Sequence, residues 1–115
     1  MKIEKFDTLP STNQYCELLN LSETEEFTVI VAHTQTAGIG QRGNHWEAEP
    51  GKNLTFSLVL KPTCLPIADQ YQLTKAVSLG IAEYLMPLIK EGDRRVRIKW
   101  PNDIYVDDKK ICGIL

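Results

Sequence analysis

The sequence predicts an α+β domain with a mixed, largely antiparallel sheet that is backed by helices. Three observations lead to this class. Several short segments have the alternating or β-branched pattern of strands, and two others have apolar residues at helical spacing. The last segment has the strand–turn–strand pattern of a hairpin, which pairs its strands antiparallel. This order of elements is typical of α+β domains.

The first third of the chain predicts a strand, a short helix and a second strand. Residues 3–6 are predicted as the first strand, and Ser11 is expected to cap a helix in which Gln14 completes a capping box. Residues 27–33 are β-branched and bounded by acidic turns, so they predict a buried strand. One apolar helix face is expected from Tyr15, Leu18 and Leu19.

The rest of the chain adds a strand, a long helix and an antiparallel end. Residues 53–61 alternate, and the face expected to be buried carries Leu54, Phe56, Leu58 and Leu60. Residues 66–86 predict a helix, and residues 95–100 predict a strand that Pro101 ends. Residues 104–115 predict a hairpin with a tight acidic turn. The helix's apolar stripe is expected from Leu73, Ala76, Val77, Gly80, Ile81, Tyr84 and Leu85.

Length and composition narrow the classes of protein. The 115 residues suffice for one small domain, and 43% hydrophobic with 24% charged residues is ordinary for a soluble protein. A net charge of −2 argues against non-specific binding to nucleic acid or membranes. Charged residues occupy the N-terminus where a secretory signal would be apolar. The three widely spaced cysteines predict reduced thiols without a metal site, so we expect a cytoplasmic protein.

Residues 38–43 form a glycine-rich loop with the spacing of a dinucleotide-binding fingerprint. That interpretation requires a helix after the last glycine, whereas residues 44–51 have no helical period and contain a Pro-Gly turn. The loop can still offer backbone N–H groups to an anion, with Arg42 as a cation and Trp46 as a flat ring for adenine. The alternative is a surface loop anchored by a buried Trp46.

Residues 99–103, Lys-Trp-Pro-Asn-Asp, place polar groups at the end of a strand. The functional interpretation has Asn102 and Asp103 orient a nucleotide or Mg²⁺, while Lys99 neutralises phosphate charge. Lys110 would return a second cation to this region across the hairpin. The structural alternatives are an ordinary strand-to-hairpin turn and an exposed turn lysine.

These motifs together resemble the biotin protein ligase family. The matching pieces are residues 11–13, 35–46, 99–103 and 110–115, in the family's order and at about its spacing. The resemblance implies a biotin/lipoate ligase-type catalytic domain and a two-step reaction with ATP, Mg²⁺ and biotin. Biotin carboxylate attacks the α-phosphate to give biotinyl-5'-AMP. A lysine of a biotin carboxyl carrier domain, part of a biotin-dependent carboxylase, then takes the biotinyl group.

The resemblance also assigns roles to residues. Lys110 and Arg42 would be catalytic, and Asp103 is the candidate for Mg²⁺. Biotin would contact Ser11, Thr12, Asn13, Gln35, Gly38, Ile39, Gly40, Gln41, Lys110 and Gly113. ATP would contact Gly40, Gln41, Arg42, Trp46, Lys99, Asn102 and Asp103. The glycine loop and residues 99–103 would then be two walls of one site.

The sequence departs from the family pattern in two ways. Ile39 and Gln41 stand where many members carry arginines, so Arg42 is expected to hold the adenylate instead. The chain also stops in mid-strand after Lys110–Leu115, so residues 1–115 are expected to be the first part of the catalytic domain. Neither the DNA-binding helix-turn-helix domain nor the C-terminal domain of the family is represented. The activity of such a piece alone is left open.

Two alternatives compete with a biotin ligase. One is a lipoate or octanoate ligase-type acyltransferase, which shares the fold but differs in the acid pocket. The other is a non-catalytic, truncated binding module. The expected partner is the carrier domain, without DNA or membrane, and a homodimer is allowed because an unpaired strand edge invites self-association.

Overall fold

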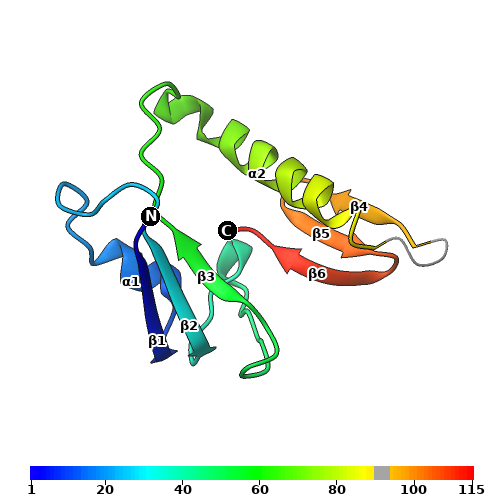
Figure 1. Ribbon diagram of the computed structural model, residues 1–115, viewed down its shortest axis with the longest axis horizontal. Helices are drawn as coiled ribbons and strands as arrows, with labels where there is room; N and C mark the ends of the chain where they lie inside the picture. Colours follow the sequence, from blue (N-terminus) through cyan, green and yellow to red (C-terminus); the bar gives the residue numbers. More distant parts are fainter. Residues whose placement is uncertain (90–93) are drawn as a thin grey trace. The chain divides into compact units, whose positions relative to one another are not determined.

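The computed structural model describes residues 1–89 and 94–115. These residues form two compact units, Met1–Pro62 and Thr63–Leu115, where the sequence predicts one small domain. Each unit has its own three-stranded sheet and at least one helix. The α+β class is therefore confirmed, with the strands divided between two sheets (Figure 1).

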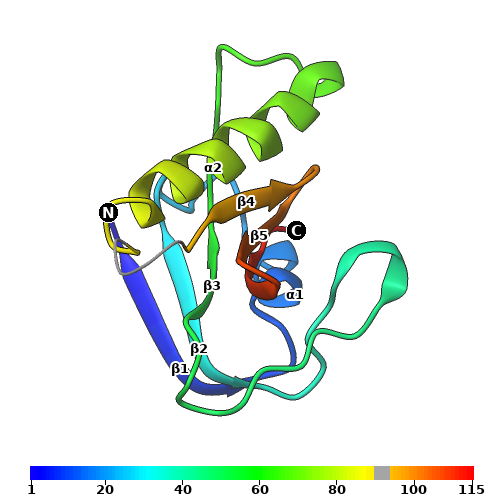
Figure 2. The ribbon, with the colours of Figure 1, turned by 90° about the vertical axis from the view of Figure 1, so that its right-hand side faces the viewer.

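The first unit is a mixed sheet with a short helix. Strands β1 (Ile3–Leu9) and β2 (Val29–Gln35) pair in parallel, and β3 (Thr55–Leu58) pairs antiparallel to β2. Helix α1 (Thr12–Glu17) lies in the connection between β1 and β2. A parallel pair needs such a crossover connection, whereas the β2–β3 link needs only a return loop. Figure 2 shows the three strands side by side.

One face of this sheet carries the core of the first unit. Leu9, Ile30 and Ala32 are buried, and side chains from β1 and α1 pack against them, with the Phe6 and Tyr15 ring centroids 4.8 Å apart. Leu19 joins this cluster, but Leu18 is 85% exposed and follows the helix as its C-cap residue. The predicted apolar helix face is therefore wrong at Leu18, because α1 ends before that residue can turn inward.

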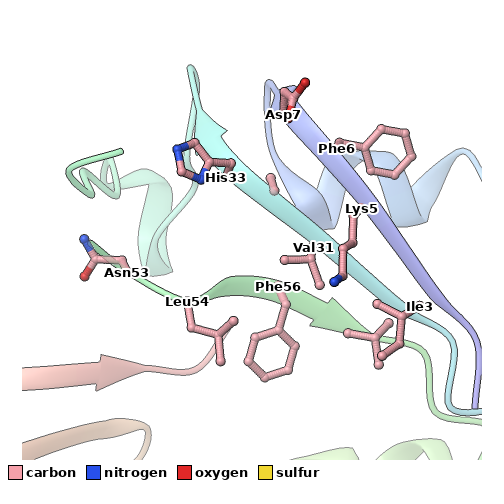
Figure 3. Close-up of a pocket in the computed structure, with 11 residues that line it drawn as sticks. Ile3, Lys5, Phe6, Asp7, Val31, His33, Asn53, Leu54 and Phe56 are labelled. Carbon is pink, nitrogen blue, oxygen red and sulfur yellow. The ribbon is translucent and has the colours of Figure 1, made fainter. Parts of the chain in front are cut away.

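The opposite face of the sheet is an open apolar groove of about 650 Å³ (Figure 3). Leu54 and Phe56, which line it, are 78% and 48% exposed, whereas Ser57 and Val59 are buried. The prediction that the leucine side of residues 53–61 is the buried face is therefore wrong. The polar side is buried instead, because it faces α1 and finds hydrogen-bond partners there.

The second unit is a helix on an antiparallel sheet. A 3-10 turn, η2 (Ile67–Asp69), leads into α2 (Gln70–Leu85), which contacts β4 and β5. Strands β4 (Val96–Lys99), β5 (Asp103–Val106) and β6 (Lys109–Gly113) follow in sheet order (Figure 1). The predicted hairpin with its Asp107-Asp108 turn is confirmed.

The buried side of α2 differs from the predicted stripe. Ser78 and Ala82 are its buried residues, whereas Tyr84 is 69% exposed. Small residues fit where the helix lies close to the sheet, so they are buried in place of Tyr84. In the described part of the chain, no helix is long and apolar enough to cross a membrane.

Candidate biotin and nucleotide site

The first group of predicted residues lies at the start of α1. Ser11 is the N-cap residue, and its Oγ accepts a hydrogen bond from the Gln14 backbone N–H at 3.5 Å. Ser11 and Thr12 are 3% and 4% exposed. The predicted cap is thus confirmed, and it holds two hydroxyl-bearing residues in the interior of the first unit.

Gln35 lies beside these residues because of the strand register. Leu9 of β1 pairs with Gln35 of β2, so the end of β2 reaches the segment that enters α1. Gln35 Oε1 accepts two hydrogen bonds from Thr12, one from its backbone N at 2.7 Å and one from its Oγ1 at 3.1 Å. Two predicted biotin-binding residues, 23 positions apart, are therefore in direct contact.

Ser57 of β3 belongs to the same cluster, although the sequence analysis did not single it out. Its Oγ lies 2.8 Å from Thr12 Oγ1 and is also hydrogen-bonded to Asn13 Oδ1. Ser57 is 45 residues from Thr12 along the chain, so no local spacing could indicate the contact. The one available signal was a serine among the alternating apolar residues Phe56, Leu58 and Leu60.

The glycine loop is closed by its own backbone into a small hairpin. Gly38 O accepts from Trp46 N at 2.9 Å, and Gly40 N donates to Asn44 O at 2.7 Å. A Cβ on Gly38 would overlap the Trp46 carbonyl oxygen and lie 3.0 Å from Gln35 Nε2. Gly38 is therefore required by close packing, and it places the loop directly beside Gln35.

Arg42 lies at the tip of this hairpin in the short 3-10 turn η1 (Gln41–Gly43). Its φ of 58° is in the left-handed region, which costs an L-residue roughly 1 kcal/mol. The residues after Gly43 form no helix up to β3, so the dinucleotide-fold interpretation is excluded by the structure as well. The exposed Arg42 side chain extends from a fixed turn and is available to an anion.

In the second unit, residues 99–103 form the turn between β4 and β5. The buried Ser78 Oγ lies 3.0 Å from Pro101 O, which ties the turn to α2, and its one proton is shared between this acceptor and Thr74 O at 2.8 Å. Asn102 is 6% exposed, and its Nδ2 donates to Ile114 O at 2.6 Å. Asn102 thus joins the turn to the segment after β6, a structural task that the sequence analysis did not predict.

Lys110 and Asp103 form an ion pair across the β5–β6 hairpin. Their Nζ and Oδ1 atoms are 2.7 Å apart, and the two side chains are 32% and 22% exposed. A register shift between Ile104 and Tyr105 accompanies this pairing. The prediction that the hairpin returns Lys110 to the Asp103 region is confirmed.

Other residues of this hairpin complete the arrangement in the second unit. Gly113 is the partner of Asp103 in the strand register, and Lys99 Nζ lies 5.9 Å from the centroid of the Tyr105 ring. Burial is the largest influence on the Cys112 thiol and raises its pKa. The hairpin can therefore present a lysine ammonium, held by a carboxylate, to an anionic substrate.

The structure therefore brings the predicted residues together in two sets. The first unit joins Thr12, Asn13 and Gln35, with the glycine loop adjacent. The second unit joins Asp103 and Lys110. Among residues 1–89 and 94–115, no three His, Cys, Asp or Glu side chains gather as metal ligands. That both sets line one site remains a prediction.

The family profile of the biotin/lipoate A/B protein ligases matches residues 5–115. The chain belongs to this family. It is also 37% identical over 107 residues to the bifunctional ligase/repressor BirA of Escherichia coli. The matched region is 93% of this chain and 32% of BirA. The chain thus spans about a third of the length of such curated relatives.

Two solved biotin ligases share the fold. The Helicobacter pylori biotin acetyl coenzyme A carboxylase synthetase, solved with biotinylated ATP, matches 99% of this chain and 53% of its own chain. Its TM-score is 0.69 and its identity 37%. The Aquifex aeolicus biotin protein ligase, solved with biotin and ATP, matches 99% of this chain and 45% of its own, with a TM-score of 0.74 and 29% identity.

Proposed function

We propose that this chain is the biotin- and nucleotide-binding part of an ATP-dependent biotin protein ligase. The enzyme forms biotinyl-5'-AMP and passes the biotinyl group to a lysine of a biotin carboxyl carrier domain. The observation that carries the proposal is the structural match over 99% of the chain to a ligase solved with biotin and ATP. All the motifs that predicted this activity lie within the matched stretch.

The first unit supplies the part that recognises biotin. The fused urea of biotin is uncharged but carries one acceptor and two donors, so it requires polar partners without net charge. Thr12, Asn13, Gln35 and the cap residue Ser11 provide hydroxyl and amide groups of this kind in one cluster. Such an uncharged, partly buried set discriminates ligands by hydrogen bonding, because an unmatched partner is left unpaired.

The second unit supplies charge for the adenylation step. The biotin carboxylate oxygen bonds to the α-phosphorus of ATP, the bond from that phosphorus to the bridging oxygen breaks, and pyrophosphate leaves with the electron pair. Two anions must approach each other, so the step needs a cation held in place rather than a base. Lys110, held by Asp103, has this role in the proposal, and Lys99 adds a second positive charge from the same turn.

The glycine loop is assigned to the carboxylate and the adenylate. In the proposal, the backbone of residues 38–41 approaches the biotin carboxylate closely. Arg42 supplies a cation at the tip of the loop, and Trp46 lies beside the adenine. Arg42 takes the part of the arginine that many family members carry at position 41. Its support is the exposed position of Arg42 at the tip of a loop that backbone hydrogen bonds close.

Mg²⁺ enters this proposal as the counter-ion of the ATP phosphates. Asp103 fits a metal-ligand role poorly, because its Oδ1 is paired with the Lys110 ammonium and it belongs to no group of three metal-ligating side chains in the described residues. We therefore assign Asp103 to positioning Lys110.

The test is biotin-dependent exchange of pyrophosphate into ATP. Exchange with biotin but not with lipoate supports the proposal, whereas the reverse pattern supports the lipoate or octanoate alternative. The hydrogen-bonding cluster favours biotin, because a dithiolane or a hydrocarbon tail offers it no amide or urea partner. Calorimetric titration with biotin separates an inactive binding module, which binds but does not exchange.

The remaining assignments extend the same proposal. The partner is a carrier domain in the cytoplasm, where ATP and carboxylases are available. These residues are proposed not to bind DNA, although the E. coli relative is named as a repressor too. A homodimer is tested by sedimentation, and DNA binding by mobility shift.

A further inference from the structure

The hydroxyl of Ser57 lies where it can decide how the neighbouring side chains present their polar atoms. Ser57 is 9% exposed and contacts both Thr12 and Asn13, while Thr12 contacts Gln35. The four residues come from α1, β2 and β3, so the cluster joins three elements of one unit. Because the network is continuous, the orientation of one group constrains the others.

The orientation of the Gln35 amide follows from its partners. The Thr12 backbone N–H is only a donor, so the Gln35 atom 2.7 Å away must be the oxygen Oε1. The amide nitrogen Nε2 then lies on the Gly38 side, 3.0 Å from where a Cβ of that glycine would stand. Gln35 therefore presents hydrogen-bond donors next to the glycine loop.

The protons of the two hydroxyls fix the rest of the network. Thr12 Oγ1 and Ser57 Oγ carry one proton each, whereas each of three contacts needs one; where Thr12 Oγ1 donates to Gln35 Oε1, it accepts from Ser57 Oγ. Ser57 has then spent its one proton and can only accept at Asn13. The structure has Asn13 Oδ1 at this contact. Turning the amide places Nδ2 there, since its two ends have the same shape, and this supplies a proton to all three contacts.

We propose that Ser57 is a positioning residue that sets the hydrogen-bond polarity of the biotin pocket. The Thr12 backbone N–H leaves Gln35 presenting its amide nitrogen, and Ser57 leaves Asn13 presenting its amide oxygen. The pair complements a cyclic urea, which has a carbonyl acceptor and N–H donors. The inference rests on the proposed function and adds a residue that sets specificity without contacting the reacting atoms.

The test compares biotin with 2-iminobiotin, whose cyclic guanidinium has donors where the urea has an acceptor. Calorimetric titration of the full chain gives a dissociation constant for each. We expect the unmodified chain to bind biotin about 100-fold more tightly than 2-iminobiotin. With the analogue, the Gln35 amide N–H faces a guanidinium N–H, and both donors remain unpaired. In Ser57→Ala, Kd for biotin rises about tenfold and Kd for 2-iminobiotin less than about twofold, since Asn13 loses its fixed orientation while the Thr12 backbone N–H still fixes Gln35.

Two variants control for folding. Thr55→Ala removes a hydroxyl from the same face of β3 and should leave the ratio of the two constants unchanged. Ser57→Thr keeps the hydroxyl and should restore the preference. If Ser57→Ala fails to fold, Ser57→Cys keeps the side-chain shape with a much weaker donor; titrated with a reducing agent, because Cys16 is a neighbour of Ser57, it should lower the ratio in the same direction.

The outcomes separate the two proposals. A chain that binds biotin but whose preference is the same in Ser57→Ala, or in Ser57→Cys where that variant replaces it, overturns the role of Ser57 and leaves the proposed function intact. Equal weakening of both ligands assigns Ser57 to packing and overturns the inference as well. An unmodified chain that binds neither ligand contradicts the proposed function and with it this inference.

Discussion

The two units hold their predicted site residues by different physical means. In the first unit, buried hydroxyls and half-buried amides, all uncharged, are joined to one another, as in the Thr12–Gln35 contact. In the second, a partly exposed ion pair between Asp103 and Lys110 projects from a hairpin. Buried neutral networks favour recognition by shape and hydrogen bonding, whereas a held ammonium favours charge neutralisation. This difference is the basis on which we propose recognition for the first unit and adenylation chemistry for the second.

The largest effect is expected from Lys110→Ala, which removes the ammonium group that Asp103 holds in the second unit. Pyrophosphate exchange by the complete ligase should fall about 1,000-fold, because one preorganised electrostatic group is lost at the transition state. The dissociation constant for biotin measured without ATP should rise much less. Lys109→Ala, one residue earlier on the same strand, is the matched control and should keep near-normal exchange. Near-normal exchange in Lys110→Ala would remove this residue from the chemistry.

Gly38→Ala should weaken biotin binding by the first unit. The new Cβ overlaps the Trp46 carbonyl oxygen, so the loop must open, and biotin affinity should fall about 100-fold through lost preorganisation. Gly80→Ala is the control, since nothing lies within 4 Å of its Cβ in α2, and it should stabilise the chain slightly. Titration with biotin checks the affinity. Unchanged affinity in Gly38→Ala would mean that the closed loop is not needed.

Ser78→Ala tests how the second unit holds its turn. The variant removes a buried hydroxyl whose proton Pro101 O shares with Thr74 O, so the free energy of unfolding should fall by about 1 kcal/mol. Urea denaturation measures the change. Ser22→Ala, in an exposed loop of the first unit, should change stability by less than about 0.5 kcal/mol. Equal effects of the two substitutions would contradict the anchoring role of Ser78.

The smallest expected difference is in the rates at which the three cysteines are alkylated. Cys64 is exposed, whereas burial raises the pKa of the Cys16 and Cys112 thiols. Because the thiolate is the reactive form, a raised pKa leaves less of it at neutral pH. Alkylation followed by mass spectrometry should label Cys64 first, and labelling of the other two should increase only at higher pH. Equal rates at neutral pH would contradict the burial seen in both units.

Local patterns predicted most of the elements and several contacts. The Ser11 cap and the hairpin that returns Lys110 to Asp103 depend on spacings of a few residues, which the sequence displays directly. The division into two sheets was not predictable in the same way. It depends on which strands pair, and strand pairing joins segments that are distant along the chain.

The buried face of β3 shows most clearly what local sequence patterns could not predict. Apolar alternation predicted that the side with Leu54 and Phe56 is buried, yet Ser57 is on the buried side. The reason is non-local, because Ser57 finds hydroxyl and amide partners at the start of α1. Asn102 is similar, since its bond to Ile114 joins a turn to a segment beyond the next hairpin.

The most direct test of the central claim is calorimetric titration of the chain with biotin and with lipoate, each followed by pyrophosphate exchange in the complete ligase. The account predicts that biotin binds, that lipoate binds at least about 100-fold more weakly, and that exchange requires biotin and Lys110. Equal binding of the two acids, or exchange that lipoate supports and biotin does not, would contradict it.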